Sequence, residues 1–472
     1  MGASAVRAGV DRAIGLLCRL VLGLFFRRIE VIGRERLPQA SAADHPVPMV
    51  VVANHVNGLV DPLFILGSLG LPARLLGKST LWKIPVLAQI LDLAGVIPVY
   101  RRQDGEGGAS PDAARNRETF ERCHEELARG GIVAIFPEGT SHDEPQLQPL
   151  KTGAARILLE AELRLGPLGC RVIPVGLMFE ERGRFRSRAL VVVGPAIDPA
   201  EEVELASRDE PTAVRLLTER VTEALHRVTL NYGSWEESRL VERGAKILEI
   251  DALELPEERR LAAEFEARRT LLDGLDALRR THPREVAAAV DAARVYDHLL
   301  TSTGLRDEQV IATYPLDRLV GYLSRMALQF AISLPAALVG LLLNIVPYAI
   351  VELVSRRFDD EPNQVATYKV FPGLVVYPLT WIVEAIVAGR LWGAASGLAV
   401  WIVAPLAGIV AARFVERQET LWREGVAFLR LRRKGQVASE LRYRRQAVGR
   451  RIEDLVELWA EAQAYSPDSR RA

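Results

Sequence analysis

The sequence predicts an α/β domain whose sheet is covered by helices, followed by a helical region and by transmembrane helices. Two observations support this prediction. Between residues 29 and 200, short apolar runs alternate with helical patterns, which is typical of a layered α/β fold. Between residues 326 and 412, the apolar residues form stretches long enough to cross a bilayer, which takes roughly 20 residues per helix.

The α/β prediction rests on six apolar runs of strand length. In chain order they read PMVVVAN, ARLLGK, GVIPVY, GIVAIF, RVIPVGLMF and ALVVVG. The helical patterns that separate several of them are STLWKIPVLAQILDLA, AARNRETFERCHEELARG and KTGAARILLEAELRLG. Because the strand runs are apolar, we expect a sheet that is covered on both faces.

The N-terminal residues 1–28 contain a short apolar run that Arg19 interrupts and that Arg27 and Arg28 follow. No small-residue cleavage site appears, so a signal peptide is not expected. MGASAV has valine at the sixth position, where a myristoylation signal has Ser or Thr. The pattern predicts an interfacial amphipathic helix with arginines at headgroup level. An ordinary packing helix is the alternative.

Three further regions follow the α/β segment. Residues 201–325 are charged and periodic, which predicts helices with one solvated face. Residues 326–412 predict about three membrane segments, with a break near Gly389-Arg390, although a very hydrophobic soluble core is the alternative. Residues 413–472 predict a basic helical tail, which suits either anionic lipid headgroups or a solvated helix face.

Composition excludes several classes of function. The 60 Lys and Arg residues balance 60 Asp and Glu residues, so the charge gives no support for a nucleic-acid partner. The three cysteines, Cys18, Cys123 and Cys170, lie far apart, which fits a reducing compartment and argues against a disulfide framework or a zinc site. With no H-E-x-x-H motif among the histidines, the sequence implies no metal, and no cofactor is expected.

Four polar signals stand at the ends of apolar runs. The first is Asn54-His55 with Asp61 downstream, and the second is Arg101 after GVIPVY. The third is FPEGTSHD at residues 136–143, and the fourth is VIPVG at residues 172–176. Ligands of open α/β sheets bind beyond strand ends, so these signals are informative together although each alone is weak.

Their order and spacing resemble the glycerolipid acyltransferase family, over about residues 30–200. GKSTLWKIP, between the first two signals, also resembles the family. One departure is that the family usually has four residues between its histidine and aspartate, whereas five separate His55 from Asp61. NHVNGLVDP, FPEGTSHDEPQLQPLKTGAARI and DEPNQVATYKVFPGLVVYPLTW resemble a narrower branch with this longer spacing, the fungal-type glycerol-3-phosphate/dihydroxyacetone-phosphate acyltransferases and their bacterial relatives.

The resemblance implies an O-acyltransferase in which an acceptor hydroxyl attacks a thioester. His55 would act as general base, and Asp61 would orient the imidazole across a turn that Gly58 permits. Arg101 would bind the acceptor phosphate with its planar fork.

The FPEG segment would shape the acceptor pocket through Glu138, Gly139, Thr140 and Ser141. The arginine that usually follows PEG in the family is missing, and Lys151 would supply the lost positive charge.

The expected donor is acyl-CoA or an acyl carrier protein, and the expected acceptor is glycerol 3-phosphate or dihydroxyacetone phosphate, with membrane lipids as further partners. Two alternatives remain: acylation of lysophosphatidate, and an inactive membrane-anchored lipid-binding protein. A lipid hydrolase would need an activated nucleophile such as G-x-S-x-G, and the sequence contains no such motif.

The catalytic domain is expected on the cytoplasmic face of a multi-pass membrane protein. Three spans would place the arginine-rich tail on the opposite face, against the positive-inside tendency. Either the tail lies outside despite its charge, or one hydrophobic segment is re-entrant or forms a hairpin.

Overall fold

The structure is a computed structural model, and it describes residues 2–37, 47–83, 85–100, 113–248, 260–305, 307–311, 316–356, 365–433 and 435–464. The chain divides into two compact units. The first unit comprises Met1–Tyr232, Asp251–Glu266 and Glu361–Thr367. The second unit comprises Gly233–Ile250, Ala267–Asp360 and Tyr368–Ala472.

The first unit is built on a mixed sheet with the strand order β1-β7-β6-β2-β5-β3-β4. The strands are β1 (Arg28–Ile32), β2 (Met49–Ala53), β3 (Ala73–Lys78), β4 (Ile97–Val99), β5 (Ile132–Ile135), β6 (Arg171–Phe179) and β7 (Arg188–Val193). Neighbouring strands are parallel except for β6 and β7, which are antiparallel. All six predicted apolar runs therefore contribute a strand to the sheet.

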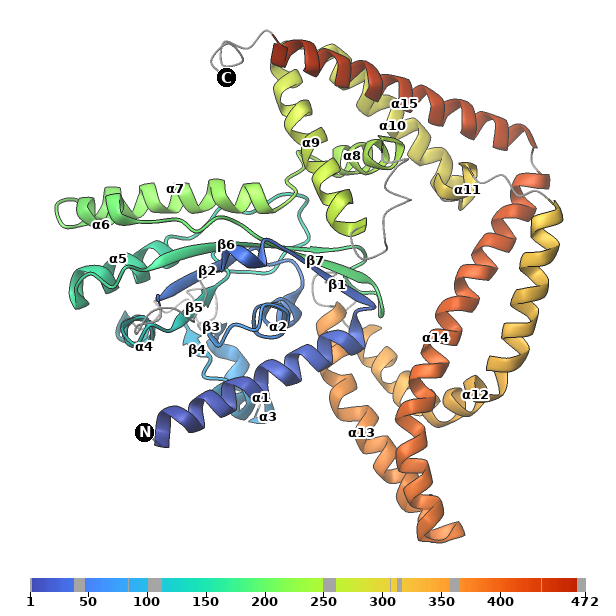
Figure 1. Ribbon diagram of the computed structural model, residues 1–472, viewed down its shortest axis with the longest axis horizontal. Helices are drawn as coiled ribbons and strands as arrows, with labels where there is room; N and C mark the ends of the chain where they lie inside the picture. Colours follow the sequence, from blue (N-terminus) through green and yellow to red (C-terminus); the bar gives the residue numbers. More distant parts are fainter. Residues whose placement is uncertain are drawn as a thin grey trace, which may run out of the picture. The chain divides into compact units, whose positions relative to one another are not determined.

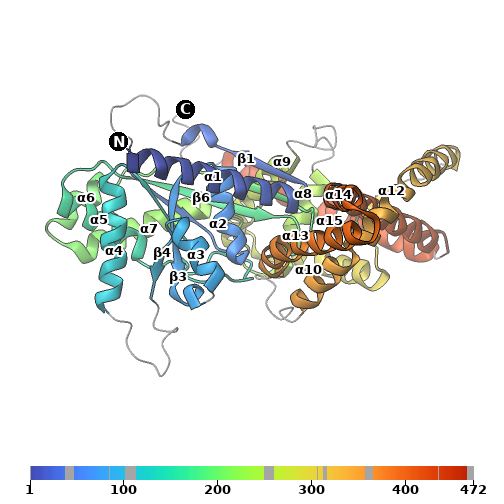
Figure 2. The same ribbon diagram turned by 90° about the horizontal axis from the view of Figure 1, so that it is seen from below.

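Helices cover both faces of this sheet, which confirms the predicted fold class. Figures 1 and 2 show α5 (Gly153–Leu165) and α7 (Glu210–Val228) on one face and α1 (Gly2–Phe25) with α2 (Asp61–Leu63) on the other. The helix α4 (Ala113–Ala128) packs beside α5, and α6 (Ala200–Ala206) packs against α5 and α7. The first unit therefore continues past residue 200 and includes α6 and α7.

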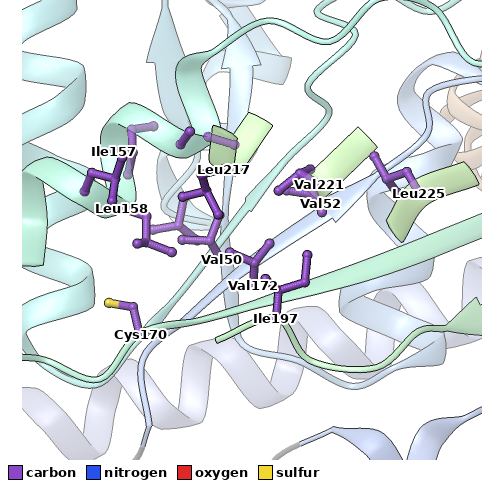
Figure 3. Close-up of a cluster of buried hydrophobic side chains, with 14 of the residues drawn as sticks. Val50, Val52, Ile157, Leu158, Cys170, Val172, Ile197, Leu217, Val221 and Leu225 are labelled. Carbon is purple, nitrogen blue, oxygen red and sulfur yellow. The ribbon is translucent and has the colours of Figure 1, made fainter. Parts of the chain in front are cut away.

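The main core lies between the sheet and α7. Figure 3 shows Leu217, Val221 and Leu225 of α7, spaced four residues apart, above Val52 of β2 and Val172 of β6. This spacing places the three α7 side chains on one helix face. Each is at most 2% exposed, and burying such a side chain stabilises the fold by roughly 1.5–3 kcal/mol.

The N-terminal helix α1 has one buried face and one exposed apolar face. Its buried side chains, including Leu22 at 1% exposed, pack against the π-helical turn η3 (Phe64–Ser68). A stripe of leucines on α1 remains exposed to between 50% and 62%, and its members are Leu16, Leu17, Leu20 and Leu24. The helix is thus a packing element of the first unit that also presents an apolar surface.

One predicted helix is broken in the structure. STLWKIPVLAQILDLA forms the 3-10 turn η4 (Ser79–Lys83) and then the helix α3 (Pro85–Leu93). Pro85 lacks a backbone N–H and has a fixed φ, so it suits the first position of a new helix better than the interior of a longer one.

The helical body of the second unit contains α8 (Trp235–Leu248), most of α9 (Arg260–Thr281), α10 (Pro283–Thr303), α11 (Asp307–Ile311) and α15 (Gly435–Ala464). The helix α15 packs along α10 and also contacts α8 and α11. Asp307 is 2% exposed, accepts a 2.6 Å hydrogen bond from the Tyr296 hydroxyl and pairs with Arg445 at 3.3 Å. The pair of Asp307 with Arg445 joins residues that are 138 positions apart in sequence.

Among the described residues, three helices are long and apolar enough to cross a membrane: α12 (Leu316–Arg356), α13 (Val365–Trp392) and α14 (Ala394–Arg433). Their apolar parts are Leu328–Arg356, Val365–Trp392 and Ala394–Glu416. The predicted hydrophobic region and the first part of the predicted tail therefore lie in continuous helices, because α14 extends from the apolar segment to Arg433.

Candidate active site

The strand register brings the first and third sequence signals together. Val52 of β2 pairs with Ile135 of the parallel neighbour β5, so three residues further on His55 emerges beside Glu138. On the other side of β2, Ala53 pairs with Val175 of β6. There the Asn54 amide donates to Leu177 O at 3.0 Å and its Oδ1 accepts from Leu177 N at 2.7 Å. Asn54 thus fixes the end of the strand that presents His55.

Residues 54–61, here called the His55 turn, close around the carboxylate of Asp61. Its Oδ2 accepts hydrogen bonds from Val56 N and Asn57 N at 2.8 Å each and lies 2.9 Å from His55 Nδ1. Gly58 has a φ of +50°, a conformation that favours glycine, and Asp61 then begins α2. The five-residue spacing is therefore accommodated by a tight turn rather than by regular helix.

The carboxylate determines which nitrogen of His55 is available. Asp61 is fully buried, and a carboxylate only accepts, so in the neutral imidazole Nδ1 carries the proton and Nε2 has the free lone pair. The His55 side chain is 16% exposed, and its ring stacks on Phe136 with centroids 4.5 Å apart. The ring is therefore fixed, and its Nε2 accepts no hydrogen bond from the described residues.

Glu138 joins the His55 turn to the loop that follows β5. Its Oε1 accepts from His55 N at 2.7 Å, and its Oε2 accepts from Gln148 N at 2.8 Å and from His142 Nε2. The His142 amide also donates to His55 O at 3.2 Å. Glu138 is 3% exposed, so the structure places it beneath the site as a bridge between two segments.

His142 is a residue that the sequence analysis did not assign. Its Nδ1 accepts from Glu144 N at 3.1 Å, so Nε2 carries the proton and donates to Glu138. His142 stands where the family usually has an arginine. The missing arginine after PEG was the feature of the sequence that could have pointed to this position.

The remaining predicted residues of the FPEG segment lie at the surface above Glu138. Gly139 has a φ of +75°, and a Cβ there would lie 2.5 Å from Lys151 Nζ, so the exposed lysine lies directly over this glycine. Thr140 is exposed and Ser141 is half-buried. Lys151 is thus brought to the FPEG segment, whereas Arg101 lies outside the described residues.

A distant segment also contacts the His55 turn. Leu59 N donates to Thr367 Oγ1 at 3.1 Å, and the first turn of α13 belongs to the first unit. In the same place, a Cβ added at Gly183 would lie 2.9 Å from Val365 Cγ1, so the Val365 side chain packs directly on Gly183. Sequence reasoning missed this contact because it joins residues 308 positions apart.

The three cysteines are buried and do not supply a nucleophile. Burial raises the pKa of Cys18 to about 11 and that of Cys123 to about 12, and it also raises the pKa of Cys170. Thiols with such values remain protonated near neutral pH. Within the part of the chain that the structure describes, no group of three or more His, Cys, Asp or Glu side chains could hold a metal ion.

Comparisons with known proteins agree with this geometry. The family model described as Acyltransferase matches residues 28–178. Glycerol-3-phosphate O-acyltransferase 2 of Saccharomyces cerevisiae is 27% identical over 287 residues, which cover 57% of this chain and 38% of the yeast protein. A chloroplastic 1-acyl-sn-glycerol-3-phosphate acyltransferase of Brassica napus is 29% identical over 153 residues, which cover 32% of this chain and 38% of the plant protein.

Among solved structures, the 1-acyl-sn-glycerophosphate acyltransferase of Thermotoga maritima matches 47% of this chain and 82% of its own, with 21% identity and a TM-score of 0.33. The chain spans well under half the length of the yeast and plant relatives just described. Residues 28–178 thus match an acyltransferase domain, and the similarity to the yeast relatives supports the glycerolipid acyltransferase family, on the branch of the fungal glycerol-3-phosphate acyltransferases.

Proposed function

We propose that the chain transfers a fatty acyl group from a thioester donor to a hydroxyl of glycerol 3-phosphate or dihydroxyacetone phosphate. The main supporting observation is the His55–Asp61 pair, in which a buried carboxylate fixes the imidazole and leaves Nε2 for the acceptor. The relatives of the fungal branch carry the name glycerol-3-phosphate O-acyltransferase, which favours this acceptor. The donor is either acyl-CoA or an acyl carrier protein.

The reaction needs a base because a hydroxyl is a poor nucleophile at neutral pH. His55 Nε2 removes the hydroxyl proton as the oxygen attacks the thioester carbonyl, and Asp61 stabilises the imidazolium that forms. The C–S bond then breaks, and the proton passes from the imidazolium to the leaving thiolate. The acceptor itself is the nucleophile, so no acyl-enzyme forms.

The structure supports separate roles for the other site residues. Glu138 and His142 each make one hydrogen bond to the His55 backbone and are hydrogen-bonded to each other, so they position the base rather than touch the acceptor. Lys151 is the cation that lies over the FPEG segment, and we assign it to the acceptor phosphate together with Arg101. We place the catalytic domain on the cytoplasmic face, with the apolar helices in the bilayer.

Acylation of lysophosphatidate is the second candidate, because relatives such as the Brassica napus protein carry that name. The test uses membranes that contain the full-length chain and a donor whose acyl group is labelled, carried either on CoA or on an acyl carrier protein. Glycerol 3-phosphate, dihydroxyacetone phosphate and lysophosphatidate are supplied in turn as acceptors. We expect labelled product with the first or second acceptor and none with His55→Ala. Product from lysophosphatidate alone would establish the second candidate. No product from any acceptor would indicate an inactive lipid-binding protein.

A further inference from the structure

The side of the membrane on which the chain leaves its apolar helices follows from α15. This helix comes after α14, yet it packs along α10 and contacts α8 and α11, all of which come before α12. Arg445 pairs with Asp307, and Arg442 Nε donates to Val310 O at 3.3 Å. The chain therefore enters and leaves the apolar region on one side, so the number of complete crossings is even.

Two of the crossings are assigned by the contacts between α13 and α14. A single residue, Gly393 with a φ of +93°, separates these helices. Ser396 Oγ donates back to Ala388 O at 2.9 Å, and a Cβ on Gly397 would lie 2.6 Å from Ala385 O. The two helices thus form a tight antiparallel hairpin, and each is long enough to cross a bilayer.

The helix α12 runs in the same direction as α13. Phe330 packs on Phe414 with ring centroids 5.3 Å apart, and the Asn344 amide donates to Ala404 O at 3.1 Å. Residue numbers therefore rise along α12 as they fall along α14, so these two helices are antiparallel. Since α13 is also antiparallel to α14, α12 and α13 both run away from the side on which α12 begins.

The helix α13 begins on that same side. Its first turn, including Val365 and Thr367, belongs to the first unit and contacts the His55 turn. Within the described residues, the candidate spans all begin at or after Leu328, so no described span separates the first unit from the start of α12. After passing Asn344, the chain must therefore return before Val365.

The sequence provides the point of return. Ala404 lies ten residues beyond Ala394, so Asn344 lies about 15 Å from the α13–α14 turn, near the middle of a core of about 30 Å. Pro347 follows three residues later, and a proline inside a helix bends it. Figure 1 shows that α12 bends at its lower end. The nine residues from 348 to 356 span about 13 Å of helix, enough for most of the return.

From these contacts we infer that α13 and α14 form the only complete crossings among the described helices, and that α12 is a re-entrant helix that turns at mid-depth near Pro347. Asn344 anchors the turning point. Its amide also donates to Gly340 O at 2.9 Å, and its Oδ1 accepts from Trp381 Nε1 at 2.9 Å, so α12, α13 and α14 meet at one side chain. This arrangement places the basic tail on the side of the acyltransferase domain, as the positive-inside tendency favours.

Single-cysteine labelling in sealed vesicles tests this topology. Cysteines are introduced one at a time at exposed positions, in a background that lacks the three native cysteines, as Ser302→Cys, Arg356→Cys, Trp392→Cys and Ser439→Cys. A membrane-impermeant maleimide is applied before and after permeabilisation. We expect positions 302, 356 and 439 to label from one side and position 392 to label only from the other.

Three complete crossings would place 356 and 439 opposite 302, and would overturn the inference. Crossing by α12 and α13 without α14 would place 356 alone opposite the other three, and would also overturn it. If the cysteine-free background fails to fold, epitope tags at the N- and C-termini of the otherwise unchanged chain are compared by protease protection. Tags accessible from opposite sides would contradict an even number of crossings.

Discussion

The His55 turn and the Asn344 contact are two polar clusters that differ in how completely their polar atoms are hydrogen-bonded. At Asn344, both amide protons and the side-chain oxygen have protein partners, which ties three apolar helices together. At the His55 turn, Asp61 Oδ2 is saturated by three donors, but His55 Nε2 has no partner among the described residues. A polar group with all its bonds made stabilises a fold, whereas an oriented group with one bond unmade can react.

The largest expected effect is loss of the unpaired nitrogen. His55→Ala removes the base and should lower kcat by roughly 10²–10⁴-fold, the usual contribution of a positioned proton acceptor. The measurement is steady-state acyl transfer by full-length protein in membranes. His298→Ala, at an exposed position on α10, is the matched control and should retain activity. Normal rates in His55→Ala would show that the unpaired nitrogen is not the reactive group.

The second effect concerns the bridge beneath the base. Glu138→Gln places an amide N–H₂ among donors from His55, His142 and Gln148, so at least one buried donor loses its acceptor. We expect a loss of about 1–3 kcal/mol in the free energy of unfolding, together with reduced kcat. Thermal unfolding in detergent measures the first quantity, with Glu144→Gln as an exposed control. Unchanged stability and kcat would mean that the bridge does not hold the base.

The third effect sharpens the comparison, because Thr367 links the start of a membrane helix to the His55 turn. Thr367→Val removes the acceptor of Leu59 N and should lower kcat about fivefold, which corresponds to about 1 kcal/mol, with little change in the acceptor KM. Thr367→Ser retains the hydroxyl and should restore the rate. Equal losses in both variants would indicate a packing role for the methyl group instead.

The smallest effect is expected at the saturated cluster. Asn344→Leu removes the hydrogen bonds among α12, α13 and α14 and should lower thermal stability by about 1 kcal/mol, the scale measured for such bonds in membranes. The acyl-transfer rate of the protein that remains folded should be unchanged. Ser333→Ala, which removes a bond within α12 itself, is the control. A loss of rate without loss of stability would place Asn344 in the reaction.

The sequence predicted the parts of the site that depend on local pattern. Apolar runs that end in Asn54-His55 and in FPEG identify strands and the polar residues beyond them, and Gly58 indicated a turn that could return Asp61 to His55. Other features depend on how the strands pair, which no single apolar run encodes. These are the antiparallel pairing of β6 with β7, the bridging position of Glu138 and its hydrogen bond with His142. Thr367 could not be predicted, because its contact with Leu59 arises only when the chain folds back.

The topology of the apolar region shows the same limit. Hydropathy identified apolar stretches for about three segments. Three crossings would place the basic tail against the positive-inside tendency, so a re-entrant segment or a hairpin remained as alternatives. The choice depends on side-chain contacts such as Asn344 with Ala404 and Arg445 with Asp307, which join distant parts of the chain.

The coupling between His55 and Asp61 tests the central claim most directly. Rates are measured for His55→Ala, Asp61→Asn and the double variant, with the same donor and acceptor. If Asp61 acts only through the imidazole that it orients, the double variant should be within about threefold of His55→Ala alone, because residues that act as a unit are strongly non-additive. Losses that multiply across the two substitutions would contradict the account, since Asp61 would then act independently of His55.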